Sequence, residues 1–158
     1  GMELALEHFT HDTLTTTLAW TWAHYRFERF VDQQQGQDVS DNHMPGLPQH
    51  IVFAEAAWRP GNGLFIIGDA RFASAVYAEN TNETRIGSHT VVNARIGKRW
   101  HFNRRELELH AGINNLFDRD YYSNIRINAN SDRPDPADRG YFEPAPGRTL
   151  YAGITIGW

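Results

Sequence analysis

Histidines could hold a metal ion, but their spacing along this chain gives little support for one. The sequence holds eight histidines in 158 residues, and the nearest pairs are His8 with His11 and His43 with His50. A structural metal site needs further ligands beside such a pair. We therefore expect no metal site and no cofactor.

A second candidate for cation binding is the acidic stretch NANSDRPDPADRG, residues 128–140. Its carboxylates, from Asp132, Asp135 and Asp138, do not follow the spacing of a calcium loop, and two prolines interrupt the stretch. We interpret it as a solvated external loop.

Glu106 and Glu108 are two residues apart, so both carboxylates point to one face if this segment is a strand. Such a pair suits general acid–base catalysis, but Arg71, Arg95 and Arg99 are expected on the same face. An ion network that lines an interior explains the pair better than catalysis does. The sequence also has no nucleophile elbow and no glycine-rich phosphate loop. We predict that the protein is not an enzyme.

Composition and net charge exclude further classes of function. The formal net charge is −4 and 22% of the residues are charged, so we expect no nucleic-acid partner. The chain has no cysteine, which excludes disulfides, thiolate metal sites and cysteine catalysis. No apolar run approaches the roughly 20 residues that a membrane-spanning helix needs.

Alternation of apolar and polar residues is frequent and helical periodicity is scarce, which predicts an all-β fold. The alternating segments, which we expect to be strands, are residues 2–9, 13–23, 50–60, 63–80, 88–102, 104–115 and 150–158. They predict one domain, an antiparallel up-and-down meander of about seven strands.

Each expected strand has an apolar face and a polar face. In residues 63–80, Asp69 and Arg71 lie opposite the apolar face. The apolar face itself is formed by Leu64, Ile66, Ala70, Phe72 and Val76. Lys98 is an exception on the apolar side of residues 88–102, near the strand end, where its long stem can snorkel.

The expected connections alternate in length. The short ones, at residues 11–12, 60–63 and 103–104, are candidates for tight hairpins. The long ones, roughly 32–47, 80–87 and 123–147, are rich in Asn, Asp, Gln, Pro and Gly. Short turns therefore collect at one end of the sheet and long loops at the other.

The alternation fits two environments. The apolar face packs inward in a soluble sandwich or barrel, but faces lipid in a transmembrane barrel. The asymmetric loops favour lipid, and so do aromatic residues of the kind that lie at membrane interfaces. These aromatic residues are Trp20, Trp22, Trp58, Trp100 and Trp158.

Two segments, INNLFDRDYY at 113–122 and EPAPGRTLYAGITIGW at 143–158, resemble the C-terminal end of TonB-dependent outer-membrane receptors. In that family an NLFD-Y segment lies on the penultimate strand, and a PGR segment opens the final strand, which ends in an aromatic residue. The matching residues are Asn115, Leu116, Phe117, Asp118, Tyr121, Pro146, Gly147 and Arg148. GMELALE and MPGLPQH also resemble the family, so the resemblance covers nearly the whole chain.

The resemblance implies a transmembrane barrel of about 22 strands around an N-terminal plug domain. Such receptors import iron-siderophore complexes, vitamin B12 or other scarce ligands, with energy relayed through TonB. We expect residues 1–158 to be a C-terminal barrel segment in the bacterial outer membrane, without the plug and the upstream strands. Active uptake and contact with TonB are expected only of the parent receptor.

The end of the chain also resembles the signal by which the outer-membrane assembly machinery recognises its clients. That signal is a final aromatic residue with apolar residues at alternating positions before it. The matching residues are Leu150, Ala152, Ile154, Ile156 and Trp158. These side chains also suit simple contact with lipid, and the two interpretations are compatible.

Seven strands leave two open sheet edges, so two alternatives remain. The chain alone is long enough to close into a small β-barrel, or two copies could pair their edges, and either would serve as a binding or structural module. A small-barrel outer-membrane enzyme would need a catalytic set at the external rim, and the sequence supplies none.

Overall fold

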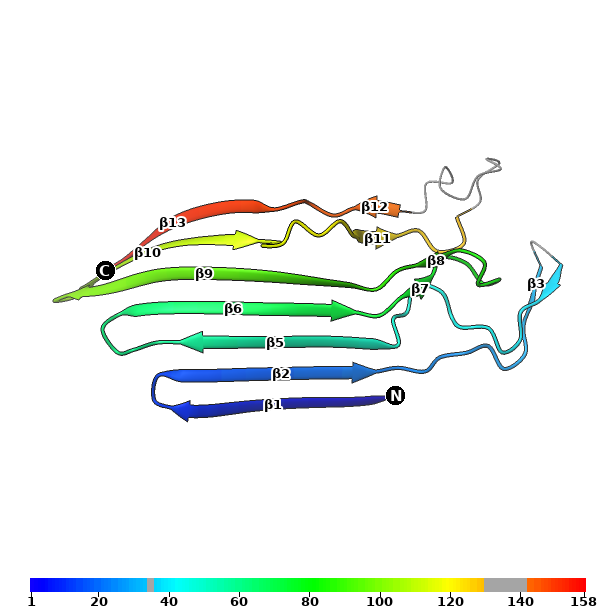
Figure 1. Cartoon of the computed structure of the whole chain (residues 1–158), viewed down its shortest axis with the longest axis horizontal. Helices are drawn as coiled ribbons and strands as arrows, with labels where there is room; N and C mark the ends of the chain where they lie inside the picture. Colours follow the sequence, from blue (N-terminus) through cyan, green and yellow to red (C-terminus); the bar gives the residue numbers. More distant parts are fainter. Residues whose placement is uncertain (34–35, 130–141) are drawn as a thin grey trace.

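The computed structural model describes residues 1–33, 36–129 and 142–158, and its main feature is one seven-stranded antiparallel sheet. The strand order is that of a meander, β1-β2-β5-β6-β9-β10-β13 (Figure 1). Their bounds are β1 Met2–His11, β2 Leu14–Trp22, β5 His50–Trp58, β6 Leu64–Ala73, β9 His89–Phe102, β10 Arg105–Asn114 and β13 Thr149–Gly157. The expected all-β meander is confirmed.

Three two-stranded hairpins extend the long loops at one end of the sheet (Figure 1). They are β3 (Val31–Asp32) with β4 (Gln37–Asp38), β7 (Val76–Tyr77) with β8 (Arg85–Ile86), and β11 (Tyr122–Ile125) with β12 (Phe142–Pro144). Tight turns occupy the opposite end, where the chain also terminates. The expected asymmetry of the loops is confirmed.

The register between the strands places the apolar residues of neighbouring strands side by side on one face of the sheet. Leu18 lies opposite Leu6 on β1 and Ala54 on β5. Ile96 lies opposite Ile66 on β6 and Ala111 on β10. Because the register is continuous, a single apolar face runs from β1 to β13, and the other face carries the ionic side chains.

The sheet does not enclose its apolar face. Leu150 is 80% exposed, Ile154 is 68% exposed and Ile96 is 50% exposed. The buried apolar residues of the sheet, Ala57 and Phe65 among them, lie instead on the ionic face. This distribution follows from a sheet whose ionic face is concave and whose apolar face is convex.

The β5–β6 turn requires glycine at one position. Gly63 has a φ of 82°, and a Cβ atom there would lie 2.0 Å from the carbonyl oxygen of Arg99. Gly63 also accepts a 2.9 Å hydrogen bond from the Arg99 amide through its own carbonyl. The turn can therefore pack against β9 only if residue 63 lacks a side chain.

The structure differs from the sequence analysis at three points. β6 ends at Ala73, so Val76 does not share the face of Leu64 but lies in the separate β7–β8 hairpin. The sequence analysis assigned no strands to the long connections, and the structure places short, locally paired hairpins there. The small closed barrel is not formed either, because β1 and β13 are the two edges of an open sheet.

None of the described residues forms a helix with the length and apolar character that crossing a bilayer requires.

Candidate functional site

A row of polar side chains crosses the middle of the concave face. Glu55 on β5 lies opposite Asp69 on β6. The Asp69 carboxylate accepts a 2.8 Å hydrogen bond from the side-chain amide of Asn93 on β9. Asn93 in turn accepts a 3.0 Å hydrogen bond from the backbone of Asn115. Arg71 approaches Asp69 at 3.8 Å. The row borders a cavity of about 260 Å³ on this face.

Glu55 has no hydrogen-bond or ion-pair partner among the residues that the structure describes. Its carboxylate is half-buried and directly opposite the carboxylate of Asp69. Like charges opposite each other on neighbouring strands are destabilising. The arrangement therefore favours a cationic or hydrogen-bond-donating group in the space beside them.

A second ionic cluster lies on the same face toward the short turns. Arg99 binds Glu108 at 2.6 Å and Glu106 at 3.1 Å. His101 lies 3.5 Å from Glu106, and His110 lies 3.3 Å from Glu108. Both carboxylates share Arg99 and each has a histidine beside it, which suits a structural ion network better than proton transfer in catalysis.

Only one of the three arginines expected to pair with Glu106 and Glu108 does so. Arg99 contacts both, whereas Arg71 pairs with Asp69 and Arg95 lies over the Phe65 ring at 5.3 Å. The sequence indicated the correct face but not the partners, because diagonal distances depend on the register between strands.

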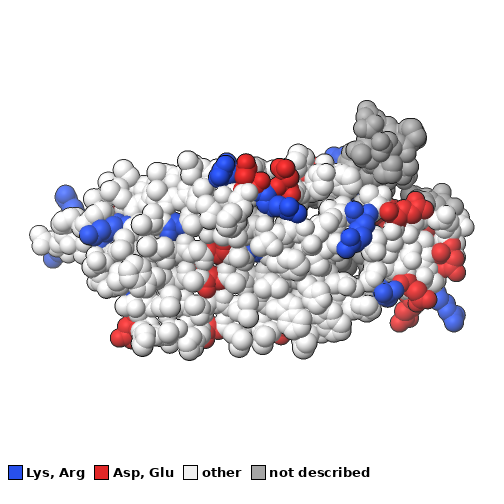
Figure 2. Space-filling view, in the orientation of Figure 1, with Lys and Arg blue, Asp and Glu red and all other residues white. Residues whose placement is uncertain are grey.

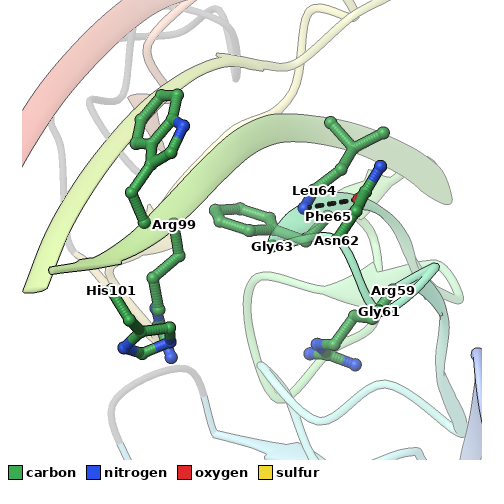
Figure 3. A pocket seen from close by; sticks show the side chains of 9 residues that line it. Arg59, Gly61, Asn62, Gly63, Leu64, Phe65, Arg99 and His101 are labelled. Atoms are coloured by element: carbon green, nitrogen blue, oxygen red, sulfur yellow. Dashed lines mark hydrogen bonds between the residues drawn. The ribbon is translucent and has the colours of Figure 1, made fainter. Parts of the chain in front are cut away.

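A cavity of about 570 Å³ opens beside this cluster at the short-turn end. Figure 3 shows Arg99 and His101 on one side of it and Arg59 with the β5–β6 turn on the other. The Asn62 side chain accepts a 3.0 Å hydrogen bond from the Leu64 amide and so holds the turn in shape.

The motif residues that resemble the receptor family form a connection between β10 and β13. Asn115 is 3% exposed and has a φ of 53°, a conformation that asparagine tolerates better than most residues. Its side chain accepts a 2.8 Å hydrogen bond from the Arg119 amide and donates a 2.9 Å bond to the Arg119 carbonyl. A longer 3.5 Å contact reaches the Pro146 carbonyl.

Asp118 joins the second half of the motif to the first. Its carboxylate accepts a 2.7 Å hydrogen bond from the backbone of Arg148 and lies 3.8 Å from the Arg148 guanidinium. Gly147 leaves room for this contact, since a Cβ atom there would lie 3.1 Å from the carboxylate. Tyr121 stacks on His89 at 4.7 Å between ring centres. Phe117, which is 74% exposed, and Leu116 complete the motif segment.

Asparagine side chains connect the long loops to one another. Asn42 donates a 2.9 Å hydrogen bond to the Asn80 carbonyl, and Asn82 exchanges bonds of 2.8 and 2.9 Å with the backbone of His43. Asn128 accepts a 2.9 Å bond from the Asn80 amide. Sequence analysis missed this network; the Asn-rich composition of the loops was its only signal.

His24 and His43 meet at the base of the first long loop, with ring centres 5.8 Å apart. Arg26 lies 3.2 Å from Nε2 of His24 and 3.1 Å from Nε2 of His43. Because arginine only donates hydrogen bonds, these contacts place the Nε2 atoms as the acceptors. Burial lowers the pKa of His43, and the neighbouring Arg26 and His24 lower it further.

The histidine pairs singled out by sequence are not the ones that meet. His43 contacts His24, whereas His50 accepts a 3.2 Å hydrogen bond from Trp20. Across the described ranges, no three His, Cys, Asp or Glu side chains are grouped as metal ligands. The stretch holding Asp132, Asp135 and Asp138 falls at 130–141, outside the described residues.

The last strand places its alternating apolar residues on the convex face. Ala152 and Ile154 lie opposite Ala111 and Leu109 of β10, and Trp158, at the end of the strand, is 95% exposed. The remaining members of this set, Leu150 and Ile156, are opposite Ile113 and Leu107.

A curved antiparallel sheet with an apolar convex face and an ionic concave face is a segment of a transmembrane-type β-barrel wall. Residues 1–116 match the model of the family described as TonB dependent receptor-like, beta-barrel. The chain belongs to this family of outer-membrane receptors.

Solved receptors have the same fold. The chain is similar to the siderophore receptor PiuA from Acinetobacter baumannii, with a TM-score of 0.74 and 18% identity over 98% of this chain and 21% of that one. It is similar to BauA, the ferric preacinetobactin receptor from the same organism, with a TM-score of 0.77 and 11% identity over 99% and 21%.

A third similar structure is the ferric yersiniabactin uptake receptor FyuA from Yersinia pestis. Its TM-score is 0.70 and its identity 17%, over 98% of this chain and 22% of that one. The chain therefore spans about a fifth of the length of the receptors that it matches.

The motif connection predicts a measurable difference between two neighbouring asparagines. Asn115→Ala should lower the free energy of unfolding by about 1–3 kcal/mol, because the Arg119 amide and carbonyl lose the buried side chain that partners them. Asn114→Ala is the matched control and should have little effect, since the structure assigns its side chain no hydrogen bond. Denaturant titration followed by tryptophan fluorescence measures both; equal losses would contradict the assigned role.

Proposed function

We propose that residues 1–158 form the C-terminal wall segment of an outer-membrane receptor that takes up a ferric siderophore or a similarly scarce ligand. The observation that carries the proposal is the continuous apolar face across all seven strands, opposite a continuous ionic face. The convex face meets hydrocarbon, and the concave face lines the lumen. The similar structures, named as siderophore and ferric-complex receptors, support this ligand class.

The two ends of the sheet have different tasks in this proposal. The long loops, tied together by asparagine side chains, face outward and meet the ligand. The short turns face the periplasm, as in other bacterial barrels. The lumen holds a plug domain carried by the rest of the receptor, and energy reaches the receptor through TonB. The ionic clusters serve structure rather than catalysis, so the segment is not an enzyme.

The sheet edges define the remaining partners. Unpaired backbone groups cannot face hydrocarbon, so β1 and β13 pair with further strands of the parent barrel. The same open edges favour a second candidate for the isolated chain, a dimer in which two copies pair their edges.

Uptake tests the proposed function. A strain that lacks the receptor should lose accumulation of radioactive iron supplied as one ferric siderophore from a panel, and the intact gene should restore it. Accumulation should also stop when TonB is deleted. Normal accumulation of every ferric complex in the deletion strain would contradict the proposal, and persistence without TonB would remove the energy coupling from it.

We also propose that the residues Leu150, Ala152, Ile154, Ile156 and Trp158 act as the assembly signal. Their support is that the strand residues share the convex face and that Trp158 is almost fully exposed at its end. Removal of Trp158 from the intact receptor should lower its abundance in the outer membrane, measured by immunoblot of purified membranes. The matched control removes an aromatic ring elsewhere on the same face, by Trp58→Ala. Unchanged abundance without Trp158 would contradict the signal.

A further inference from the structure

The convex face carries fixed charge at only two positions of the described seven-stranded sheet, and both are cations. Lys98 lies opposite Leu64 and Leu109, and Arg105 lies opposite Phe102. No carboxylate from these seven strands shares the face. Both cations belong to the short-turn half of the sheet, so the charge on this face is positive and confined to one end.

Lys98 is half-buried among apolar neighbours and forms no ion pair with any described residue. Its ammonium lies 5.6 Å from the centre of the Trp100 ring. Trp100 is two residues nearer the turn, so the lysine side chain extends along β9 toward the short-turn rim. A lysine in hydrocarbon takes this course to bring its charge to the interface.

The rim around these cations has interfacial character. Phe102 is 57% exposed and Trp158 is 95% exposed. Large aromatic side chains of this kind lie at the headgroup level of a bilayer. Figure 2, which shows the ionic face, has basic side chains close to the tip formed by the β9–β10 turn. The rim therefore offers apolar contact area next to the two cations of the convex face.

We propose that Lys98 and Arg105 bind the headgroup phosphate of a glycerophospholipid in the leaflet at the short-turn end. The site rests on the proposed function, because it requires this face to meet lipid. Four residues of strand separate Lys98 from the Phe102–Arg105 pair, about 13 Å. The lysine ammonium lies beside Trp100, two residues nearer the rim, which shortens that span.

The two cations have complementary chemistry toward a phosphodiester. Arg105 can donate two parallel hydrogen bonds to phosphate oxygens, and Lys98 supplies a point charge. Trp100 and Phe102 contact the glycerol and the first acyl carbons beneath the headgroup. The ligand class is thus an anionic phospholipid, recognised by its phosphate. A soluble anion has no apolar part that could contact the aromatic rim.

Native mass spectrometry of the intact receptor tests the site. The receptor is released from vesicles that contain phosphatidylglycerol or, separately, a diacylglycerol with the same acyl chains and no phosphate. We expect stronger retention of phosphatidylglycerol by the wild-type protein. Loss of each cation should lower this retention about fivefold, the equivalent of roughly 1 kcal/mol. Lys98→Gln combined with Arg105→Gln should therefore lower it about 25-fold.

Matched variants separate the phosphate contact from damage to the fold. Lys98→Arg with Arg105→Lys keeps both charges and should keep retention near the wild-type level. Arg71→Gln removes a cation from the concave face and should leave the retention of phosphatidylglycerol unchanged. Equal retention by the double glutamine variant, or equal retention of the two lipids by the wild type, would overturn the site. The phosphate site would also be overturned if the wild-type receptor retained no lipid and instead formed a dimer through this face.

Carbonate extraction of the same membranes distinguishes the two proposals. A wild-type receptor that resists extraction supports the proposed function, whatever lipid it retains. If it resists extraction while the variants retain lipid as the wild type does, only the phosphate site fails. If the wild type is extracted, the proposed function fails and the site fails with it.

Discussion

Successive side chains of a β-strand point to opposite faces, and this alternation is the constraint on which the structure depends. Seven strands in register extend it into two surfaces, one apolar and one ionic. Because Leu18, Ile96 and Ile154 share a face, a shift of one residue in any pairing would bring polar or charged side chains into the apolar surface. The ionic surface is equally constrained, since Arg99 reaches Glu106 and Glu108 only in this register.

The loops and the motif hold that register at the long-loop end. Asn115 and Asp118 bring the start of β13 to the end of β10, and asparagine side chains join the loops outside the sheet. These contacts are polar and local, whereas the sheet itself has few buried apolar residues. The proposed lipid contact on the convex face and the proposed pairing of the two edges would supply the apolar burial that the sheet itself lacks.

Most of the sheet could be predicted from sequence, because period-two alternation is a local signal. The segments at 2–9 and 104–115, for example, correspond to β1 and β10. Residue 76 was misplaced because alternation continues past Ala73, while the backbone leaves the sheet. The loop hairpins and the His24–His43 contact could not be predicted, since they join residues with no periodic pattern. The motif at Asn115 and Asp118 was visible as a resemblance, but its hydrogen bonds required coordinates.

The central claim is that the apolar face meets lipid and the ionic face does not. The accessibility of each position to oxygen, which dissolves in lipid, measures this most directly. The chain has no cysteine, so single cysteines can carry a spin label at successive positions 91–96 of β9 in the intact receptor within a bilayer. The account predicts high oxygen collision rates at Val92, Ala94 and Ile96, and low rates at Val91, Asn93 and Arg95. The opposite phase, or rates without a period of two, would contradict it.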